Sequence, residues 1–338
     1  YMVSQVELHH RIFSFPLTGS PPSCIIVAMM YETFFNFDLR QIAASGQCFR
    51  MRETAPGVYT IVSRGRLLTV SQEGPKVAFD CPETDLSYWK EYFDCATDYG
   101  HIQSMVSPKD PYLTAAAKAG QGIRILRQEP WEMIITFVIS QQKTIPKIRE
   151  AVEALSRAYG TRLETAPETK PLAAVSPRTA AQGLEDEGFY AFPTPEQLNR
   201  ASLEELSALK LGYRAKYIKK LCADAAEGRL DLNLLETLDY SAAMDYLTGF
   251  YGIGRKVANC ICLFGLHHIE AFPVDTWIEK ILKNEYYPKH PRKYAALPKA
   301  QLYPAIIRDF FGRYRGCAGV MQQYIFYYER LRQNRAEV

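Results

Sequence analysis

The spacing of apolar residues changes once along this 338-residue chain, near residue 85, and this change limits the fold more than any other feature. Before it, the pattern is strand-like. Segments 57–62 and 66–70 flank the turn Ser63-Arg64-Gly65 and predict a β-hairpin, and segment 76–79 predicts a further strand. We therefore expect an antiparallel sheet in the N-terminal part of the fold.

Beyond residue 85, apolar residues recur at helical spacing. Thr194 followed by Pro195, and Ser202 ahead of two glutamates, are typical helix starts. The chain is therefore predicted to be α+β and mostly α, with an antiparallel β-sheet subdomain over residues 31–120 and an all-helical domain over residues 121–338. The clearest helical segments are 131–140, 145–159, 195–208, 213–226 and 242–250, and the Pro-, Thr- and Ala-rich segment 161–177 predicts a loop or short linker.

The composition is that of an ordinary globular protein, and the cysteines and histidines show no metal-binding pattern. With 47% apolar and 23% charged residues, this is an ordinary globular chain, long enough for two or three subdomains. Its formal charge of +3 does not identify a partner, although segment 213–220 is densely basic. The cysteines form no CxxC pair and the histidines no HxxxH or HExxH pattern. We therefore expect reduced thiols and no metal site.

The first thirty residues fit poorly with the rest of the chain. Their longest apolar run, 25–30, is far shorter than the roughly 20 residues that a membrane span requires. They also lack a positively charged start followed by a long apolar core, so we expect no secretory signal. Residues 1–30 are predicted to be an N-terminal extension, weakly ordered or arising from the start site.

A tight glycine turn, Gly252-Ile253-Gly254, follows the helical segment 242–250 and precedes a further helix from about Arg255 to Gly265. Glycines permit the tight backbone, and the start of the second helix presents free N–H groups to which a phosphate oxygen can bind. The turn can equally serve only to reverse the chain between two packed helices. Taken alone, this short motif leaves both interpretations open.

Lys256 and Asp275 lie nineteen residues apart, and each position suits chemistry. A helix over 255–265 runs roughly 15 Å, and the nine residues after it can span that distance back. Asp275 should therefore return to the end of the helix where Lys256 lies. Burial and the positive end of a helix favour the neutral, nucleophilic amine. Taken singly, Lys256 is more simply a phosphate-binding cation, and Asp275 an ordinary helix N-cap.

At this point four motifs carry a family resemblance. The run 252–256 followed by Pro273-Val274-Asp275 resembles the helix-hairpin-helix DNA glycosylases, termed HhH-GPD. Lysine at position 256 marks their bifunctional glycosylase/lyase branches. Segments 44–50, 211–217 and 258–263 look like further signatures of 8-oxoguanine DNA glycosylases, and the resemblance covers about residues 34–330. It implies a TBP-like sheet subdomain followed by the helical catalytic domain, with the hairpin at 245–263.

The resemblance also implies a role for each matching residue of the site. The Gly46 carbonyl would accept the N7 hydrogen that oxidised guanine has and guanine lacks. Cys260 and Phe326 would sandwich the extruded base, and Gln322, with Gln323 as the alternative, would bond its Watson–Crick edge. The remaining implied roles are DNA contacts: Gln142 fills the gap in the duplex, Tyr213 wedges beside the orphaned cytosine, Arg214 hydrogen-bonds that cytosine, and Gly252 and Gly254 bind phosphate.

Two positions depart from animal members of the family. Their asparagine-rich segment is replaced by Gln141-Gln142-Lys143-Thr144, and Trp277 stands where they carry a phosphate-contacting histidine. The opposite-base preference and that phosphate contact therefore stay open. Tyr213 and Phe326 also have a simpler interpretation as core aromatics, and Cys260 as a small buried hydrophobe.

The resemblance implies a base-excision repair enzyme that acts as a monomer, without a cofactor, on duplex DNA containing 8-oxoguanine, opposite cytosine. Lys256 would form a Schiff base with the sugar, supported by Asp275, and β-elimination would nick the strand. We expect it in the cytoplasm, at the nucleoid, if the source is a bacterium, and in the nucleus if it is a eukaryote. Two rivals remain: an alkylated-base glycosylase of the same superfamily, and a non-enzymatic protein that uses the hairpin only to bind DNA.

Overall fold

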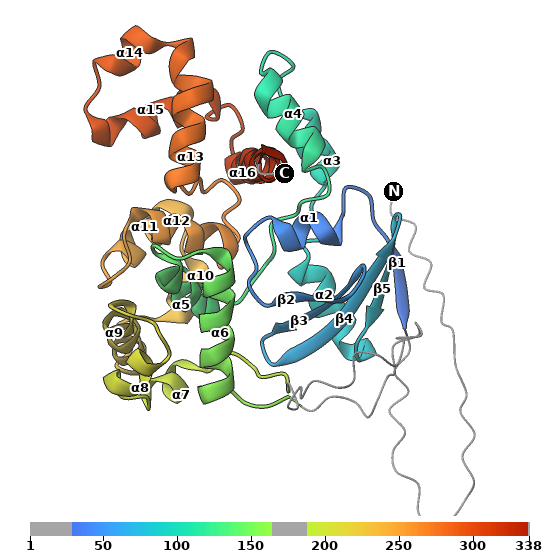
Figure 1. Cartoon of the computed structure of the whole chain (residues 1–338), viewed down its shortest axis with the longest axis vertical. Helices are drawn as coiled ribbons and strands as arrows, with labels where there is room; N and C mark the ends of the chain where they lie inside the picture. Colours follow the sequence, from blue (N-terminus) through green and yellow to red (C-terminus); the bar gives the residue numbers. More distant parts are fainter. Residues whose placement is uncertain (1–28, 164–187, 337–338) are drawn as a thin grey trace, which may run out of the picture.

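The structure is a computed structural model, and it describes residues 29–163 and 188–336. The predicted N-terminal extension lies outside the described residues up to position 28. Most of the predicted linker, from residue 164 onward, lies outside them too. The described chain forms a β-sheet with flanking helices at one end and a larger helical domain at the other (Figure 1). The predicted α+β, mostly α fold is confirmed.

The sheet is antiparallel throughout and its strand order is β1-β5-β4-β3-β2. The predicted hairpin forms between β3 and β4, where Ser63 pairs with Arg66. Arg64 (φ 46°) and Gly65 (φ 72°) both adopt the left-handed conformation that a two-residue hairpin turn needs. The strands are β1 (Met30–Thr33), β2 (Met51–Ala55), β3 (Val58–Ser63), β4 (Arg66–Glu73) and β5 (Lys76–Asp80).

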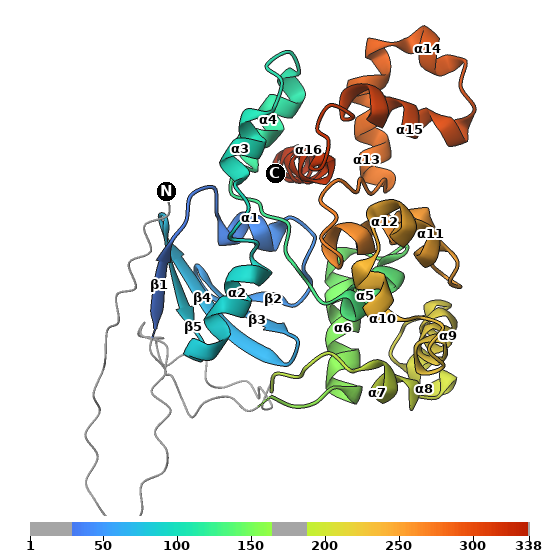
Figure 2. The same ribbon diagram turned by 180° about the vertical axis from the view of Figure 1, so that it is seen from behind.

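One face of the sheet packs against helix α2 (Leu86–Tyr92) to form a small separate core. Ile61, Leu68 and Phe79 on the strands are fully buried, as is Trp89 on the helix. The burial alternates along β4, as expected for a sheet with one face covered. Figure 2 shows α2 lying across the strands, with α1 (Leu39–Ala44) at their upper edge.

The helical domain is built around α5 (Pro130–Ser140), in which ten of the eleven residues are buried. Such a helix is buried on all sides because other helices surround it, and eight of its ten buried residues are apolar. The helix predicted over 195–208 is divided in two because Ser202 starts a new helix with a capping box to Glu205. The other helices are α3 (Tyr99–Ser104), α4 (Pro111–Ala119), α6 (Ile145–Tyr159), α7 (Pro195–Asn199), α8 (Leu203–Ala208), α9 (Arg214–Ala226), α10 (Leu232–Thr237), α11 (Tyr240–Thr248), α12 (Arg255–Phe264), α13 (Thr276–Ile281), α14 (Pro291–Ala295), α15 (Lys299–Phe310) and α16 (Ala318–Ala336).

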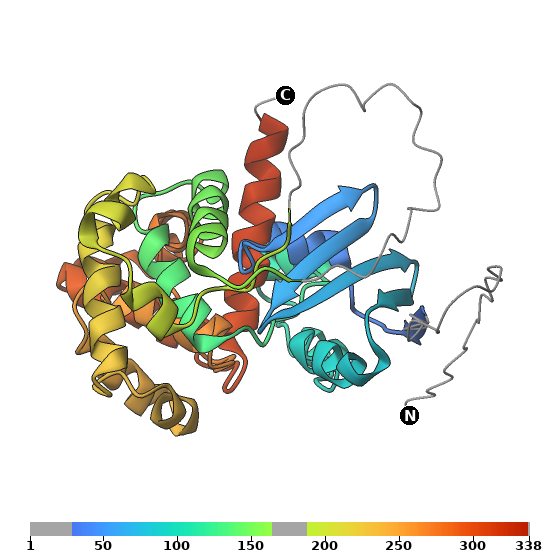
Figure 3. The ribbon, with the colours of Figure 1, turned by 90° about the horizontal axis from the view of Figure 1, so that it is seen from below.

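The core of the sheet and the core of the helical domain are two separate clusters of buried residues, and helices α3, α4 and α16 lie where they meet. Helices α3 and α4 precede residue 120, yet their buried side chains Tyr99, Leu113 and Ala116 belong to the helical core. Helix α16 also packs on α4, and Arg330 Nη1 donates to the Ala44 carbonyl of α1 at 2.7 Å. Viewed from below, α16 stands between the helical domain and the sheet (Figure 3). Residues on α16 are therefore placed where the two parts of the fold meet.

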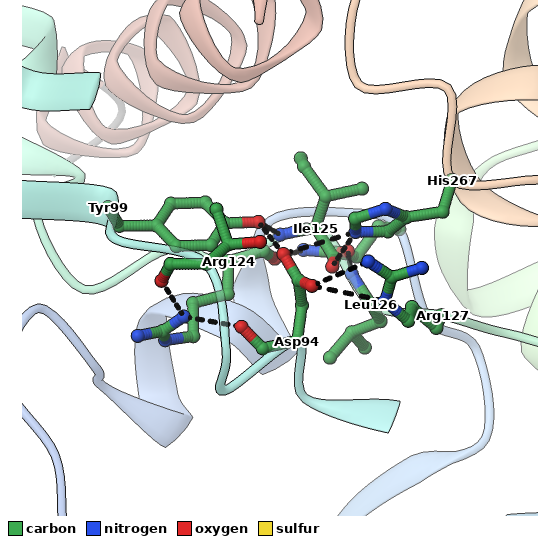
Figure 4. A network of polar contacts seen from close by, with 9 residues as sticks. Asp94, Tyr99, Arg124, Ile125, Leu126, Arg127 and His267 are labelled. Atoms are coloured by element: carbon green, nitrogen blue, oxygen red, sulfur yellow. Dashed lines mark hydrogen bonds and ion pairs between the residues drawn. The ribbon is translucent and has the colours of Figure 1, made fainter. Parts of the chain in front are cut away.

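A buried polar network fixes this junction (Figure 4). The carboxylate of Asp94, which follows α2, accepts hydrogen bonds from Arg127 Nε at 3.0 Å and from the Tyr99 hydroxyl at 3.0 Å. His267 Nε2 lies 3.2 Å from the same carboxylate. Burial raises the pKa of the Asp94 carboxyl, but its bond to His267 and the other partners outweigh burial and hold the pKa below its usual value. Since His267 follows α12, the network couples the sheet side to the helix that carries Lys256.

Candidate active site

Lys256 lies in the first turn of α12, and Cys260 lies one turn later on the same helical face. The lysine is half-buried, and its Nζ stands 3.4 Å from Ser140 Oγ and 5.5 Å from the centre of the Phe137 ring. Both partners belong to the last turn of α5. The amine is therefore held between helices α5 and α12.

Asp275 is the N-cap of α13, as its position before Thr276 predicts. Its Oδ1 accepts the backbone N–H of Trp277 at 3.0 Å and of Ile278 at 2.9 Å. Both capping bonds use the same oxygen, so the carboxylate is fixed in orientation while Oδ2 takes no part in the cap.

Lys256 and Asp275 both influence the pKa of the Cys260 thiol. Burial raises its pKa, the neighbouring Lys256 ammonium lowers it, and the Asp275 carboxylate raises it. Both groups therefore act electrostatically on one sulfur, which places Asp275 near the face of α12 that carries Lys256 and Cys260. Of the ion pairs between described residues, none within 4.0 Å joins Lys256 to Asp275.

The glycine turn joins α11 to α12 and leaves the start of α12 uncapped. Gly252 has φ +92°, and a Cβ there would lie 2.5 Å from Cγ of Tyr217, so glycine is required on both counts. Gly254 is the N-cap of α12, provides no side chain to bond the first amides, and faces open space. These amides are therefore available to an anion, and α12 starts with the geometry that favours phosphate.

Gly46 follows α1 and lies against side chains of α6 and α16. Gly46 has φ +79°, and a Cβ there would lie 3.1 Å from the Phe326 ring and 3.6 Å from Ile145. Gln47 beside it is fully buried, donating to the Arg124 carbonyl and accepting the Leu126 N–H, both at 2.8 Å. The Gly46 backbone is therefore held rigidly against Phe326 by its neighbour in the motif.

Gln322 and Gln323 are both buried on α16, one turn before Phe326. Gln323 Nε2 donates to Gln322 Oε1 at 2.9 Å, which orients the Gln322 amide with its own Nε2 away from that bond. Gln323 Oε1 is buried and has no hydrogen-bond partner among the described residues. The two glutamines form a coupled pair, whereas the sequence suggested them only as alternatives.

The residues predicted to contact the orphaned cytosine cluster at the end of α5. Gln142 has φ +53°, so its loop turns sharply. Arg214 is buried and donates from Nε to the Gln141 carbonyl at 2.8 Å and from Nη1 to the Leu211 carbonyl at 3.2 Å. Tyr213 is 43% exposed, and the Arg214 guanidinium lies over its ring, 4.5 Å from the ring centre. In this arrangement Arg214 holds the loop that presents Gln142.

Three further residues lie at the site that the sequence did not predict for it. Ser140 contacts the lysine, and Ile145 lies 3.6 Å from where a Cβ of residue 46 would stand. Gln141 Nε2 donates to the Gly252 carbonyl at 3.1 Å and thereby joins the Gln142 loop to the glycine turn. Gln141 could have been noticed only as the neighbour of Gln142, because a side-chain bond to a distant backbone leaves no local pattern.

The described residues hold no group of three His, Cys, Asp or Glu side chains that could bind a metal ion. The seven cysteines among them are free thiols. No helix in the described part of the chain is both long and apolar enough to cross a membrane.

Comparisons with known proteins assign this fold and site to a class. The HhH-GPD superfamily of base excision DNA repair proteins matches residues 135–300, which include the turn, Lys256 and Asp275. The N-terminal domain of 8-oxoguanine DNA glycosylase matches residues 30–134, which include Gly46. The chain belongs to the 8-oxoguanine DNA glycosylase family.

Solved structures and curated relatives agree with this assignment. The structure of MBOgg1 with a low-affinity DNA ligand has TM-score 0.77 and 31% identity, covering 98% of this chain and 100% of that one. The Clostridium acetobutylicum 8-oxoguanine glycosylase/lyase, bound to DNA with cytosine opposite 8-oxoguanine, has TM-score 0.76 and 31% identity, covering 90% and 96%. The N-glycosylase/DNA lyase of Saccharomyces cerevisiae is 32% identical over 61% of this chain, which spans about half (54%) of that protein.

Proposed function

We propose that this chain is a bifunctional N-glycosylase/DNA lyase that excises 8-oxoguanine from duplex DNA, opposite cytosine, and then nicks the strand. The observation that carries the proposal is that Lys256 lies in the first turn of the uncapped helix α12, with its Nζ 3.4 Å from Ser140 Oγ, while the Asp275 carboxylate is fixed as the N-cap of α13. Relatives named N-glycosylase/DNA lyase and 8-oxoguanine glycosylase/lyase support it. As an enzyme of DNA, it would work in the nucleoid or the nucleus.

The first step would bring the damaged nucleotide out of the duplex. Unstacking a base costs a few kcal/mol, which DNA contacts have to offset. The amides at Gly252 and Gly254 would bind the backbone, while Gln142 fills the vacated space and Tyr213 wedges beside the orphaned base. Arg214 would stabilise this loop and meet the cytosine once its bond to a backbone carbonyl is exchanged.

The extruded base would enter the pocket between Cys260 and Phe326. The Gly46 carbonyl would accept the N7 hydrogen of 8-oxoguanine, and guanine would leave that buried acceptor without a donor. An unsatisfied buried polar group costs about 1–3 kcal/mol, which is enough to discriminate strongly between the two bases. Gln322, oriented by Gln323, would bond the Watson–Crick edge.

Chemistry would then centre on Lys256. After losing its ammonium proton, the amine would attack the sugar C1′ as the C1′–N9 bond breaks, and the Asp275 carboxylate would stabilise the positive charge that develops on the sugar. The base would leave with the C1′–N9 electron pair and take up a proton from the attacking amine. The C1′–O4′ bond would then break, with O4′ taking up a proton, to give a Schiff base. Loss of a C2′ proton would start β-elimination, in which the C3′–O bond breaks and the 3′ phosphate leaves. No step uses a metal ion or an organic cofactor.

A substrate panel tests the proposal. Under single-turnover conditions the enzyme should release 8-oxoguanine opposite cytosine, leave guanine and alkylated bases in place, and nick the strand at the vacated site. Release of alkylated bases without a nick would favour the alkylated-base rival. Salt-dependent binding of every duplex without a chemical product would favour the non-enzymatic rival.

A further inference from the structure

Residues 280–315, which include α14 and α15, carry an unusual concentration of positive charge. They hold nine Lys or Arg residues against two Asp or Glu, a net charge of +7, whereas the whole chain has +3. The other 302 residues therefore sum to −4. Figure 1 shows this segment as a lobe at the end of the molecule away from the sheet, reached from α12 through α13. We refer to residues 280–315 as the basic lobe.

The acidic residues of the basic lobe are already paired. Asp309 receives Lys293 Nζ at 2.6 Å, and Glu285 accepts from Arg332 at 3.4 Å. The free cations are exposed, and none of them forms a hydrogen bond or ion pair with another described residue. They are Lys283, Arg292, Lys299, Arg308, Arg313 and Arg315.

The basic lobe is held rigidly on the catalytic domain. Tyr286 is fully buried, and its ring centre lies 5.0 Å from both Phe310 and Phe311. Phe311 in turn lies 4.9 Å from Phe272, three residues before Asp275. Aromatic packing of this kind fixes the cations relative to the catalytic carboxylate before any DNA binds.

We propose that the basic lobe is a second DNA-binding surface, which contacts the phosphate backbone of the duplex on one side of the lesion. This inference rests on the proposed function, because Asp275 then marks the position of the damaged nucleotide. The chain from Asp275 to Lys289 is nearly all helical. Fourteen helical residues advance at most about 21 Å, or roughly six base pairs of DNA. Lys289 therefore lies no farther from Asp275 than about six base pairs of duplex extend, and the proposal places the cations of the basic lobe against phosphates within that reach.

Duplex length separates this surface from the hairpin site. Two series of 8-oxoguanine:cytosine duplexes keep about twelve base pairs on one side of the lesion and shorten the other side from about twelve to three. Affinity should fall steeply between about eight and four base pairs in one series, while the other series changes less. Equal behaviour of the two series would overturn the proposal.

A neutralised variant identifies the residues responsible. Arg292→Gln/Lys299→Gln/Arg313→Gln/Arg315→Gln should reduce the slope of log affinity against log salt by about 1 for each phosphate that is no longer bound, on the long duplex only. It should bind the shortened duplex like the parent. An unchanged slope on the long duplex, or an equal reduction on both duplexes, would contradict the proposal. A matched control, Lys109→Gln/Lys118→Gln/Arg157→Gln/Arg200→Gln, removes the same charge from exposed positions elsewhere and should keep the slope of the parent.

The parent enzyme on the shortened duplex keeps the two proposals distinguishable. Base release and borohydride trapping there depend on Lys256 and not on the basic lobe. If trapping succeeds and length dependence fails, only the basic-lobe proposal is wrong. If trapping fails on every duplex, the catalytic proposal itself is wrong.

Discussion

Helices α12 and α13 each carry a charged group that acts on the Cys260 thiol, yet one helix begins without a capping side chain and the other with one. α12 begins at Gly254 with no capping side chain, whereas α13 begins at Asp275, whose Oδ1 accepts two backbone amides. Both ends carry the same partial positive charge. The difference teaches that an open helix start leaves its amides available to an external anion, while a capped start uses the same amides to fix a carboxylate, here the one that we propose to be catalytic.

Removing the charge at the capped start should have the largest effect. Asparagine caps a helix about as well as aspartate, so Asp275→Asn should keep the thermal stability of the parent. The negative charge that stabilises the transition state is lost, and we expect the single-turnover rate of base release to fall by about 10²–10³-fold. An unchanged rate would show that Asp275 is only a cap.

A change in the base pocket should leave both helix starts intact and separate binding of the base from chemistry at the sugar. Gly46→Ala places a methyl group 3.1 Å from the Phe326 ring at φ +79°. Release of 8-oxoguanine should fall by about 10–200-fold, the usual range for one methyl group in a pocket. Nicking of a preformed abasic site should stay near the parental rate, and equal losses in both assays would remove Gly46 from the base pocket.

The two glycines of the turn should respond differently to alanine. At Gly252 the new Cβ meets Tyr217 at 2.5 Å and the backbone has φ +92°, so unfolding should become easier by about 2–4 kcal/mol. At Gly254 the space is open and φ is −86°, so stability should change by at most about 1 kcal/mol. The Gly254→Ala methyl group would meet an approaching phosphate and weaken DNA binding. Equal denaturation midpoints for both variants would contradict this distinction.

The smallest effect is expected at the start of a third helix, α5. Burial raises the pKa of Glu132 in its first turn to about 7, against a partial offset from Arg50, whose Nη1 lies 3.8 Å away. Because the folded protein holds this proton more tightly than the unfolded chain, the contribution to stability is complete below the ordinary pKa of 4.5 and is lost as pH rises to about 7. Thermal unfolding of Glu132→Gln should therefore vary less between pH 4.5 and 7 than that of the parent.

The exposed substitution Glu204→Gln, in the first turn of α8, is the matched control for Glu132→Gln. It should keep the pH dependence of the parent. If Glu132→Gln shows that same dependence, burial of Glu132 does not govern stability in this pH range.

Much of the fold could be predicted because it follows local patterns. The β3–β4 hairpin has its turn glycine, and α6 was predicted with the bounds it has. Strands β1 and β2 were missed because they are short edge strands; β2 is buried only at Met51 and shows no alternation. The start at Ser202 was seen, but apolar spacing that continued past it hid the break between α7 and α8.

The residues of the candidate site also divide into those that a local pattern predicts and those that it does not. Lys256, Asp275 and the glycine turn lie in one stretch of sequence, so chain geometry alone could bring them together. The contacts of Gln141 with Gly252 and of Gln323 with Gln322 depend on side-chain orientation, which no spacing pattern encodes. The burial of Arg214 against backbone carbonyls could not be predicted either, because a basic segment usually indicates a solvent-exposed face.

Borohydride trapping on an 8-oxoguanine:cytosine duplex, with the parent and Lys256→Gln side by side, tests the central claim most directly. The parent should release the base and become covalently joined to the DNA, whereas Lys256→Gln should bind the same duplex, release no base and form no trapped complex. Full base excision by Lys256→Gln would contradict the account.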